Sequence, residues 1–322
     1  MTMSVSASAS AGRVANGALP IASAPCAFGV DEVLTDGTWM PDADEMLDWM
    51  LGIGYAGTEL GPPGFLGAGS AARARLERRG LQLVGAFLPG HFSRADRAPA
   101  DRHWLREQLV LLRAATPDGS SPFAVLCEAL DEPDRLRCSG RIDVHPEAQL
   151  DDSRVRMMLD NLHRAGELCH ELGFKAVIHP HAGTYIETDP EIERVVAGLD
   201  PSVVGLCLDT GHFRYGGADP AQRVRDYRDV LQHVHLKDCR TQVLHDVRRD
   251  DQGLAEALAR GVFTELGTGD SDIDAVVEAL RDVGYDGWVV VEQDRKLDER
   301  VTRQDMVASQ RRNLAYLRAL GL

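Results

Sequence analysis

Four apolar segments of the chain each end in side chains that can bind a divalent cation. The four groups are His179-Pro-His181, Asp209-Thr-Gly-His212, His233-Val-His235 and Glu292-Gln-Asp294. They stand tens of residues apart, so no local motif joins them. Parallel strands of one barrel, however, deliver their carboxyl ends to a shared mouth. The sequence therefore predicts one metal site in which Asp209, His235 and Glu292 are ligands.

A fourth ligand would come from His179 or His181. Side chains alternate along a strand, so these two residues share one face and the sequence leaves the choice open. Mixed nitrogen and oxygen ligands suit Mn²⁺, Co²⁺, Zn²⁺ or Fe²⁺, whereas Ca²⁺ prefers oxygen alone and thiolate is absent from the set. We therefore expect a divalent transition metal or zinc as the cofactor.

Further polar side chains near the same segment ends are candidates for proton transfer. Lys237 follows His235 by two residues, so its ammonium would face the same side and could stabilise an enolate, although a salt bridge to Asp238 or Glu292 would also explain it. Glu59 could contact substrate or cap a helix, and Glu187 is a second candidate base. The predicted catalytic residues are Glu59, Glu187, His212 and Lys237.

Three residues beyond the predicted strands are candidates for substrate binding. His91 follows the third strand in Pro89-Gly-His91, where a structural role is equally open. His212 and Arg214 follow Asp209, and the aromatic residues around Arg214 would either shape a pocket or pack a helix. We expect all three to face the mouth of the fold.

To bring these groups together the chain must alternate short strands with longer helices, and it does. The expected strands are 26–30, 56–60, 81–88, 123–127, 174–179, 203–208, 233–236 and 288–292. The expected helices between them are 42–51, 71–79, 104–114, 154–172, 190–197, 221–230 and 272–283, with apolar residues at helical spacing. This pattern predicts a single-domain (β/α)8 barrel over residues 25–322, although an open doubly wound sheet would alternate similarly. Two polar stretches, 131–152 and 239–266, read as loop insertions at one barrel end.

Composition limits the classes of function. The chain has 322 residues, of which 44% are hydrophobic and 26% charged, and a formal charge of −15 that disfavours binding to a phosphate backbone. Six cysteines lack CxxC spacing and indicate reduced thiols of a cytoplasmic protein. Residues 1–24 are rich in Ala and Ser and are expected to form a disordered tail, and no apolar run reaches the roughly 20 residues of a membrane span.

Nucleotide cofactors and serine hydrolase chemistry find no support. The chain has no Gly-x-Gly-x-x-Gly that opens a helix after a strand, no Gly-Lys-Ser/Thr and no Gly-x-Ser-x-Gly.

Several motifs resemble the inosose dehydratase family of xylose isomerase-like, sugar phosphate isomerase/epimerase barrels. They are Gly54-Tyr-Ala-Gly-Thr-Glu-Leu-Gly61, Arg79-Gly-Leu-Gln-Leu-Val84, His179-Pro-His-Ala-Gly-Thr184, Asp209-Thr-Gly-His212, His233-Val-His-Leu-Lys-Asp238 and Gly287-Trp-Val-Val-Val-Glu-Gln-Asp294. The resemblance implies a TIM barrel with one Mn²⁺ or Co²⁺ site, in which Asp209, His235 and Glu292 match family ligands. The usual fourth ligand there is a glutamate, and His179 or His181 takes its place here. The chain departs from the family at Gly29-Val-Asp-Glu32 and Glu265-Leu-Gly267, which leaves the substrate open.

The resemblance also implies a reaction. We expect the substrate to be a keto-polyol or keto-sugar whose carbonyl is polarised by the metal, so that an enediolate forms. Dehydration of 2-keto-myo-inositol is the leading expectation, with keto-sugar epimerisation or isomerisation and β-elimination of a 3-keto-glycoside as alternatives. A non-catalytic sugar-binding barrel and an endonuclease-IV-like enzyme are readings from other classes. Barrels of this kind often pair, so a homo-oligomer is an open expectation.

Overall fold

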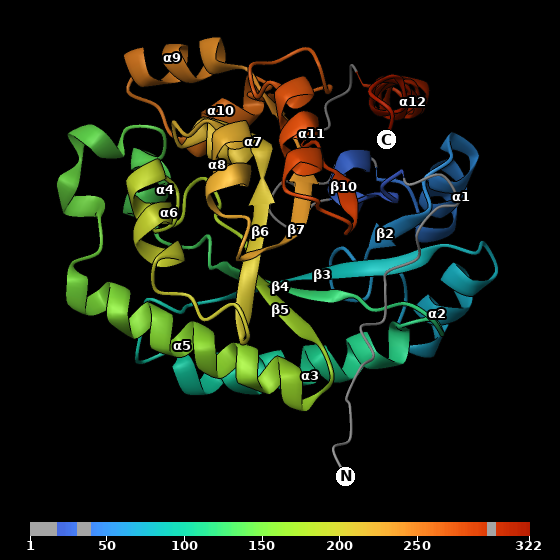
Figure 1. Ribbon diagram of the computed structural model, residues 1–322, viewed down its shortest axis with the longest axis horizontal. Coiled ribbons are helices and arrows are strands. Elements are labelled where there is room, and N and C mark those ends of the chain that lie inside the picture. The colour runs from blue at the N-terminus through green and yellow to red at the C-terminus, as the bar shows by residue number, and fades with distance from the viewer. Residues whose placement is uncertain (1–17, 31–39, 295–300) are drawn as a thin grey trace.

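Eight parallel strands close into a barrel in the computed structural model, which describes residues 18–30, 40–294 and 301–322 (Figure 1). In barrel order the strands are β1 (Ile21–Ser23), β10 (Val289–Val291), β7 (Leu231–Leu236), β6 (Val204–Asp209), β5 (Lys175–Ile178), β4 (Phe123–Glu128), β3 (Gln82–Gly90) and β2 (Gly57–Glu59). Strand β1 pairs with both β2 and β10, with Ala22 beside Gly57 and Val290. The predicted (β/α)8 barrel is confirmed, and the open sheet is excluded because the ring closes.

The first strand lies earlier in the chain than the sequence predicted. It is Ile21–Ser23, within the segment expected to be a tail, whereas Pro25–Phe28 of the expected strand 26–30 forms a 3-10 helix. Pro25 has no amide hydrogen to donate to a neighbouring strand, so the ladder ends before it. The barrel domain therefore begins before residue 25, and residues 1–17 of the expected tail lie outside the described residues.

Helices surround the strands as predicted. The outer helices are α1 (Ala43–Ile53), α2 (Ser70–Glu77), α3 (Ala98–Ala115), α5 (Asp152–Glu171), α6 (Asp189–Val196), α8 (Pro220–Asp226), α11 (Ile273–Asp282) and α12 (Arg303–Ala319). Asp42 and Asp151 cap α1 and α5 by accepting hydrogen bonds from backbone amides of the first turn, which stabilises these helix starts. Helix α12, which the sequence did not predict, packs beside α1, and its Asn313 accepts a hydrogen bond from the amide of Leu266.

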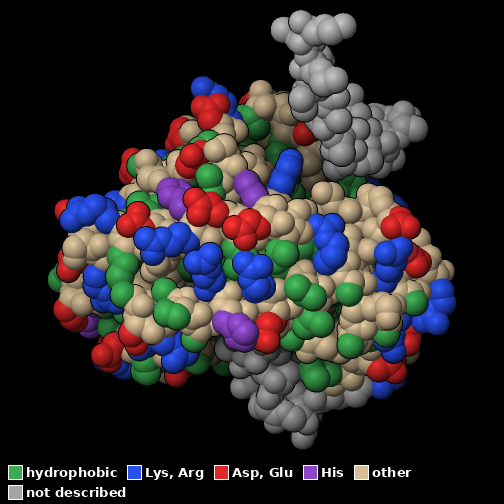
Figure 2. Space-filling model, turned by 90° about the horizontal axis from the view of Figure 1, so that it is seen from below, with side chains coloured by type: hydrophobic (Ala, Val, Ile, Leu, Met, Phe, Trp, Pro, Cys, Tyr) green, Lys and Arg blue, Asp and Glu red, His purple; other side chains and the backbone are tan. Residues whose placement is uncertain are grey.

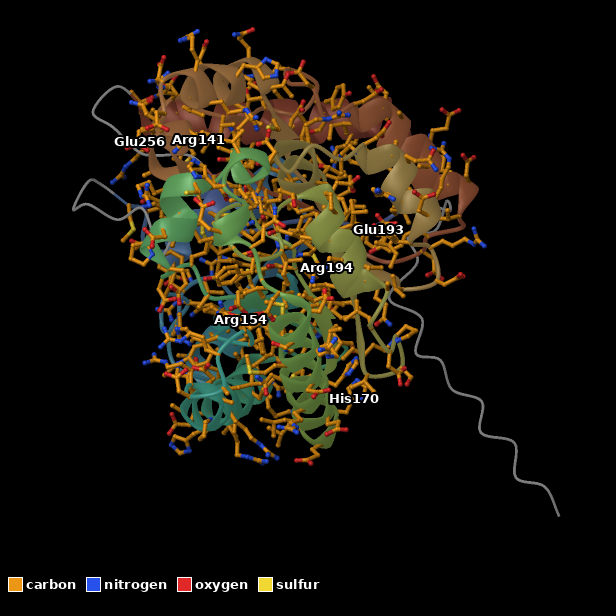
Figure 3. The ribbon with its side chains drawn as sticks, turned by 90° about the vertical axis from the view of Figure 1, so that its left-hand side faces the viewer. Arg141, Arg154, His170, Glu193, Arg194 and Glu256 are labelled. Atoms are coloured by element: carbon orange, nitrogen blue, oxygen red, sulfur yellow. The ribbon has the colours of Figure 1, made fainter. Side chains whose placement is uncertain are left out.

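The two predicted insertions contain short elements that pack against each other. The first holds α4 (Pro133–Cys138) and two 3-10 helices, Ile142–Val144 and Pro146–Ala148. The second holds α9 (Thr241–Arg249), α10 (Leu254–Ala259) and the antiparallel pair β8 (Asp238–Cys239) and β9 (Phe263–Thr264), and α10 contacts α4. In Figure 3, Arg141 and Glu256 of the two insertions lie near the upper edge, and His170 at the end of α5 lies near the lower edge. The insertions thus cover one end of the molecule.

The surface carries mixed charge. Figure 2 shows acidic and basic side chains interspersed over the face seen from below, with hydrophobic side chains scattered between them. Five of the six cysteines are buried. Within the part of the chain that the structure describes, none of the helices combines the length and the apolar character needed to cross a bilayer.

Candidate metal centre

The four predicted ligand groups meet at the carboxyl ends of four neighbouring strands. Strands β5, β6, β7 and β10 are adjacent in the barrel, and the short helix α7 (Thr210–Tyr215) follows β6 directly. One donor atom each from His179, Asp209, His235 and Glu292 lies within 4.8 Å of the other three, and all four side chains are buried. Closure of the ring therefore brings together residues that the sequence separates by up to 113 positions, from 179 to 292.

Two donor atoms at this centre need a partner. Oδ1 of Asp209 accepts hydrogen bonds from the amides of Gly211 and His212, while Oδ2 of Asp209 and Nδ1 of His235 are buried and make no hydrogen bond within the described residues. Their nearest oppositely charged groups are Nζ of Lys237, 3.3 Å from Oδ2 of Asp209, and Oε1 of Glu292, 3.3 Å from Nδ1 of His235. Burial also raises the pKa of Asp209 to about 6, because nearby Lys237 offsets only part of that effect. A bound cation would be a closer partner for both atoms and would offset the burial of the Asp209 carboxylate, so these residues fit a metal.

The two histidines are oriented by partners on their outer nitrogens. Nδ1 of His179 donates to the carbonyl of Pro180 at 2.9 Å, which leaves Nε2 facing Oδ2 of Asp209 at 3.8 Å. Nε2 of His235 lies 3.1 Å from Oε1 of Glu59, which leaves Nδ1 3.3 Å from Oε1 of Glu292. An outer partner of this kind fixes the tautomer and the ring orientation of a metal-binding histidine.

His181 belongs to a neighbouring group. Its Nδ1 donates to the carbonyl of Ala182 at 2.8 Å, and its ring stacks on that of His212 with centroids 3.7 Å apart. With His212 and Asp294 it forms a second cluster of donor atoms beside the first. The geometry thus favours His179 as the fourth ligand and leaves Nε2 of His181 free to face the cavity.

Glu59 bridges two histidines of β7. Its Oε1 lies 2.9 Å from Nε2 of His233 and 3.1 Å from Nε2 of His235, at the end of β2 on the opposite side of the ring. Burial would raise the pKa of Glu59, but the two imidazoles outweigh it and lower the pKa to about 2. Glu59 therefore holds His235 in place, and it also lines the cavity beside the centre.

Lys237 is surrounded by carboxylates. Its Nζ lies 2.8 Å from Oδ2 of Asp294, 3.0 Å from Oε2 of Glu292 and 3.3 Å from Oδ2 of Asp209. These three acids raise the pKa of Lys237 well above its usual value, although burial acts to lower it. Carboxylates thus outnumber the ammonium at this centre, which favours a bound cation.

Three predicted site residues lie elsewhere. The carboxylate of Glu187 accepts hydrogen bonds from the hydroxyl of Ser139 and from the amides of Gly140 and Gly183, so it joins the first insertion to the loop after β5. It lines a different cavity together with Arg214. The structure does not bring either residue to the metal centre, because both line this other cavity and the carboxylate of Glu187 is taken up by its hydrogen bonds.

His91 also points away from the centre. Its Nδ1 lies 3.1 Å from Asp101 of α3, and its Nε2 lies 2.8 Å from Asp131 in the first insertion. These two acids raise the pKa of His91 against the effect of burial. The contacts join two segments of the fold, which is the structural role that the sequence left open.

A cavity of about 500 Å³ opens over the metal centre. Its polar lining comes from Glu59, His179, His181, Lys237, Glu292 and Asp294 at the centre, and from Arg137, Asp251, Gln252 and Glu256 of the two insertions. Asp294 and His233 were not among the predicted site residues, although both stand two residues from a predicted ligand and so share its strand face. Alternation along the strand was the signal that could have found them.

Comparison with known proteins decides the family. Residues 47–319 match the xylose isomerase-like TIM barrel family, and the inosose dehydratase of Geobacillus kaustophilus is 37% identical over 265 residues, which cover 78% of this chain and 80% of that protein. The chain is an inosose dehydratase-like member of this family. The inosose dehydratase of Bacillus licheniformis is 28% identical over 253 residues, 79% of this chain and 81% of its own. The predicted family and the prediction of an enzyme are confirmed.

Two solved structures share the fold. The IOLI protein with a zinc atom bound aligns with a TM-score of 0.67 and 14% identity over 93% of this chain and 98% of its own. The 3-keto-D-glucoside 4-epimerase YcjR from E. coli aligns with a TM-score of 0.63 and 20% identity over 94% and 99%. At these identities the likeness concerns the barrel alone.

Proposed function

We propose that the protein is a divalent-metal-dependent lyase that removes water from a cyclic keto-polyol, most directly 2-keto-myo-inositol, through an enediolate. The observation that carries the proposal is the pair of buried atoms, Oδ2 of Asp209 and Nδ1 of His235, which face one point and make no hydrogen bond among the described residues. Relatives named inosose dehydratase support the substrate. The zinc atom in the IOLI protein supports a cation in such a barrel.

His179, Asp209, His235 and Glu292 would hold the cation. Two nitrogens and two carboxylates suit Mn²⁺ or Co²⁺, which we propose, and also Zn²⁺ or Fe²⁺. When bound, the cation supplies Lewis acidity that polarises the ketone and acidifies the neighbouring C–H. Glu59 keeps the ring of His235 in its binding orientation.

Proton transfer falls to the residues beside the ligands. Nδ1 of His181 is occupied by the carbonyl of Ala182, so its Nε2 is the nitrogen that can accept the proton from substrate. Lys237 stays protonated among its three carboxylates, and its ammonium stabilises negative charge on the substrate oxygen and donates a proton to the departing hydroxyl. His212, whose Nε2 lies 3.0 Å from Nζ of Lys237, positions that ammonium.

A direct assay tests this proposal. Metal-loaded protein is incubated with 2-keto-myo-inositol in D₂O, and both the dione chromophore and exchange of the α-proton are followed. The proposal expects both signals, and both should disappear after chelation and return when metal is added back. Absence of exchange with fully loaded protein would sink it.

Epimerisation or isomerisation of a keto-sugar is the alternative within the same chemistry, since the enediolate can be protonated again instead of losing its β-hydroxyl. In the same experiment it would give α-proton exchange without the dione. A purely sugar-binding barrel would give neither signal, so exchange separates catalysis from binding.

A further inference from the structure

Glu187 and Arg214 line a cavity of about 420 Å³, which we call the Arg214 cavity. It shares no lining residue with the cavity over the metal centre. Its walls come from the first insertion, the start of α6, the end of α7 and helix α9, and these three helices lie in the upper left part of Figure 1. The two insertions therefore meet at a hollow that the proposed reaction does not use.

The guanidinium of Arg214 has no partner in this cavity. The side chain is half-buried, its Nε is out of contact with solvent, and it makes no hydrogen bond or ion pair with a residue that the structure describes. Arg135 and Arg141 also have a buried Nε, but their terminal nitrogens donate to Glu191 and Asp251. A guanidinium presents parallel N–H groups that match the oxygens of a carboxylate or a phosphate. Arg214 is therefore suited to bind an anion.

His245 adds a second donor to the same cavity. It comes from α9, it is half-buried, and its ring makes no hydrogen bond with a described residue. A neutral imidazole donates one N–H, and the protonated form donates two and carries a positive charge. Hydrogen bonds from Thr241 lower the pKa of Asp270, and the charges of Arg214 and His245 add to this effect, so both groups lie near one carboxylate. Neither forms an ion pair with it.

The carboxylates around the cavity already have partners. Asp143 accepts hydrogen bonds from Arg248 at 2.8 and 3.0 Å. Asp270 accepts the amide and the hydroxyl of Thr241, both at 2.7 Å. Glu187 accepts three hydrogen bonds from the first insertion and the loop after β5. Within the described residues, an ion pair therefore does not cancel the positive charge of the unpaired guanidinium.

The net charge of the chain does not exclude a small anion here. The formal charge of −15 is spread over 322 residues, and at physiological ionic strength exposed charges more than about 8 Å apart are largely screened. The side chains that line the cavity therefore decide what binds. A cavity of about 420 Å³ has the size of small-molecule sites, so it can hold an organic molecule around the anionic group.

We propose that the Arg214 cavity binds a small molecule that carries a phosphate or carboxylate group, with the anionic group held by Arg214 and His245. The ligand contacts the first insertion and α9 of the second insertion together, so its binding stabilises their packing. Both insertions also line the cavity over the metal centre, which makes this a second site beside the catalytic one. The proposal does not depend on the proposed function.

Equilibrium dialysis tests the site in the metal-loaded, full-length protein. Radiolabelled inorganic phosphate and radiolabelled acetate are dialysed separately at constant ionic strength, and the bound amount per chain is measured. We expect saturable binding of at least one of them, and the one that binds identifies the group. Arg214→Met should weaken that binding about tenfold or more, because charge-assisted hydrogen bonds are lost. His245→Phe should weaken it less, since the guanidinium remains.

Arg156→Met is the matched control. Arg156 is an exposed arginine of α5 that makes no hydrogen bond or ion pair through its side chain with a described residue. The control changes the net charge by the same amount but does not touch the cavity, so it should keep the affinity. Melting temperature and metal content show whether each variant is folded.

Three outcomes would overturn the proposal. One is the absence of saturable binding of both phosphate and acetate to the wild type. Another is equal affinity in wild type and Arg214→Met, as expected if the anion sat on the metal. The third is an equal loss in Arg156→Met, which would show a dependence on net charge alone.

Discussion

Oε1 of Glu59 lies 3.1 Å from Nε2 of His235, although 176 residues separate them in the chain. This contact turns Nδ1 of His235 toward Glu292 and Asp209 and fixes which nitrogen can bind a cation. The same carboxylate oxygen also contacts His233, so one residue of β2 orients two of β7.

Glu59→Gln should weaken metal binding. Glutamine keeps an oxygen that can accept a hydrogen bond but loses the charge, so the ring of His235 is held less firmly. Loss of such an outer partner typically costs about 10–100-fold in metal affinity. Competition titration with a chelating dye measures the affinity, and saturating metal should restore much of the activity. Glu107→Gln, on the exposed side of α3, is the control. An unchanged affinity would contradict the role given to Glu59.

His179→Ala and His181→Ala should fail in different ways. The first removes a ligand whose Nε2 faces Asp209, so purified protein should contain little metal. The second should retain metal but slow α-proton exchange about 10²–10⁴-fold, the usual contribution of a general base. Elemental analysis beside the exchange assay separates the two. The opposite pattern would make His181 the ligand.

Lys237→Met should lower both the catalytic rate and the stability of the metal-free protein. The methionine side chain fills similar space but leaves Asp209, Glu292 and Asp294 without their ammonium, and breaking a buried ion pair from one side costs about 3–5 kcal/mol. We expect the melting temperature of the metal-free variant to fall and added metal to raise it by more than it raises wild type. If metal raised the melting temperature of the variant and of the wild type equally, the ammonium of Lys237 and the cation would not be compensating the same carboxylates.

Glu128→Gln should change how stability depends on pH. Burial raises the pKa of Glu128 from 4.5 to about 7, although hydrogen bonds from Ser93 act to lower it. Between pH 4.5 and 7 the folded protein therefore binds this proton more tightly than the unfolded chain does. The contribution of the protonated carboxyl to the free energy of unfolding is complete below pH 4.5 and is lost as pH rises through 7. Relative to wild type, the variant should gain up to about 3 kcal/mol between pH 4.5 and 8. Urea unfolding across this range measures the difference, and parallel curves for the two proteins would refute it.

Much of the fold could be read from periodicity. All the expected strands from 56–60 onward correspond to observed ones, because buried parallel strands are short apolar runs between helices with one apolar face. The strand Ile21–Ser23 escaped detection because it has three residues in an Ala- and Ser-rich stretch, and the longer run after Pro25 competed with it. Helix α12 escaped because its apolar stripe is narrow, and its partners lie far away in the chain.

The barrel, the family and the strands that carry donor side chains could be predicted from the sequence, because they depend on local patterning and on residue types at strand ends. The choice between His179 and His181 could not be predicted, nor could the position of Glu187, Arg214 and His91 away from the centre. These positions depend on the hydrogen-bond partners of each side chain and on how the two insertions pack. Glu187, for example, accepts three hydrogen bonds from Ser139, Gly140 and Gly183. Such contacts join distant residues, so only the closed tertiary structure decides them.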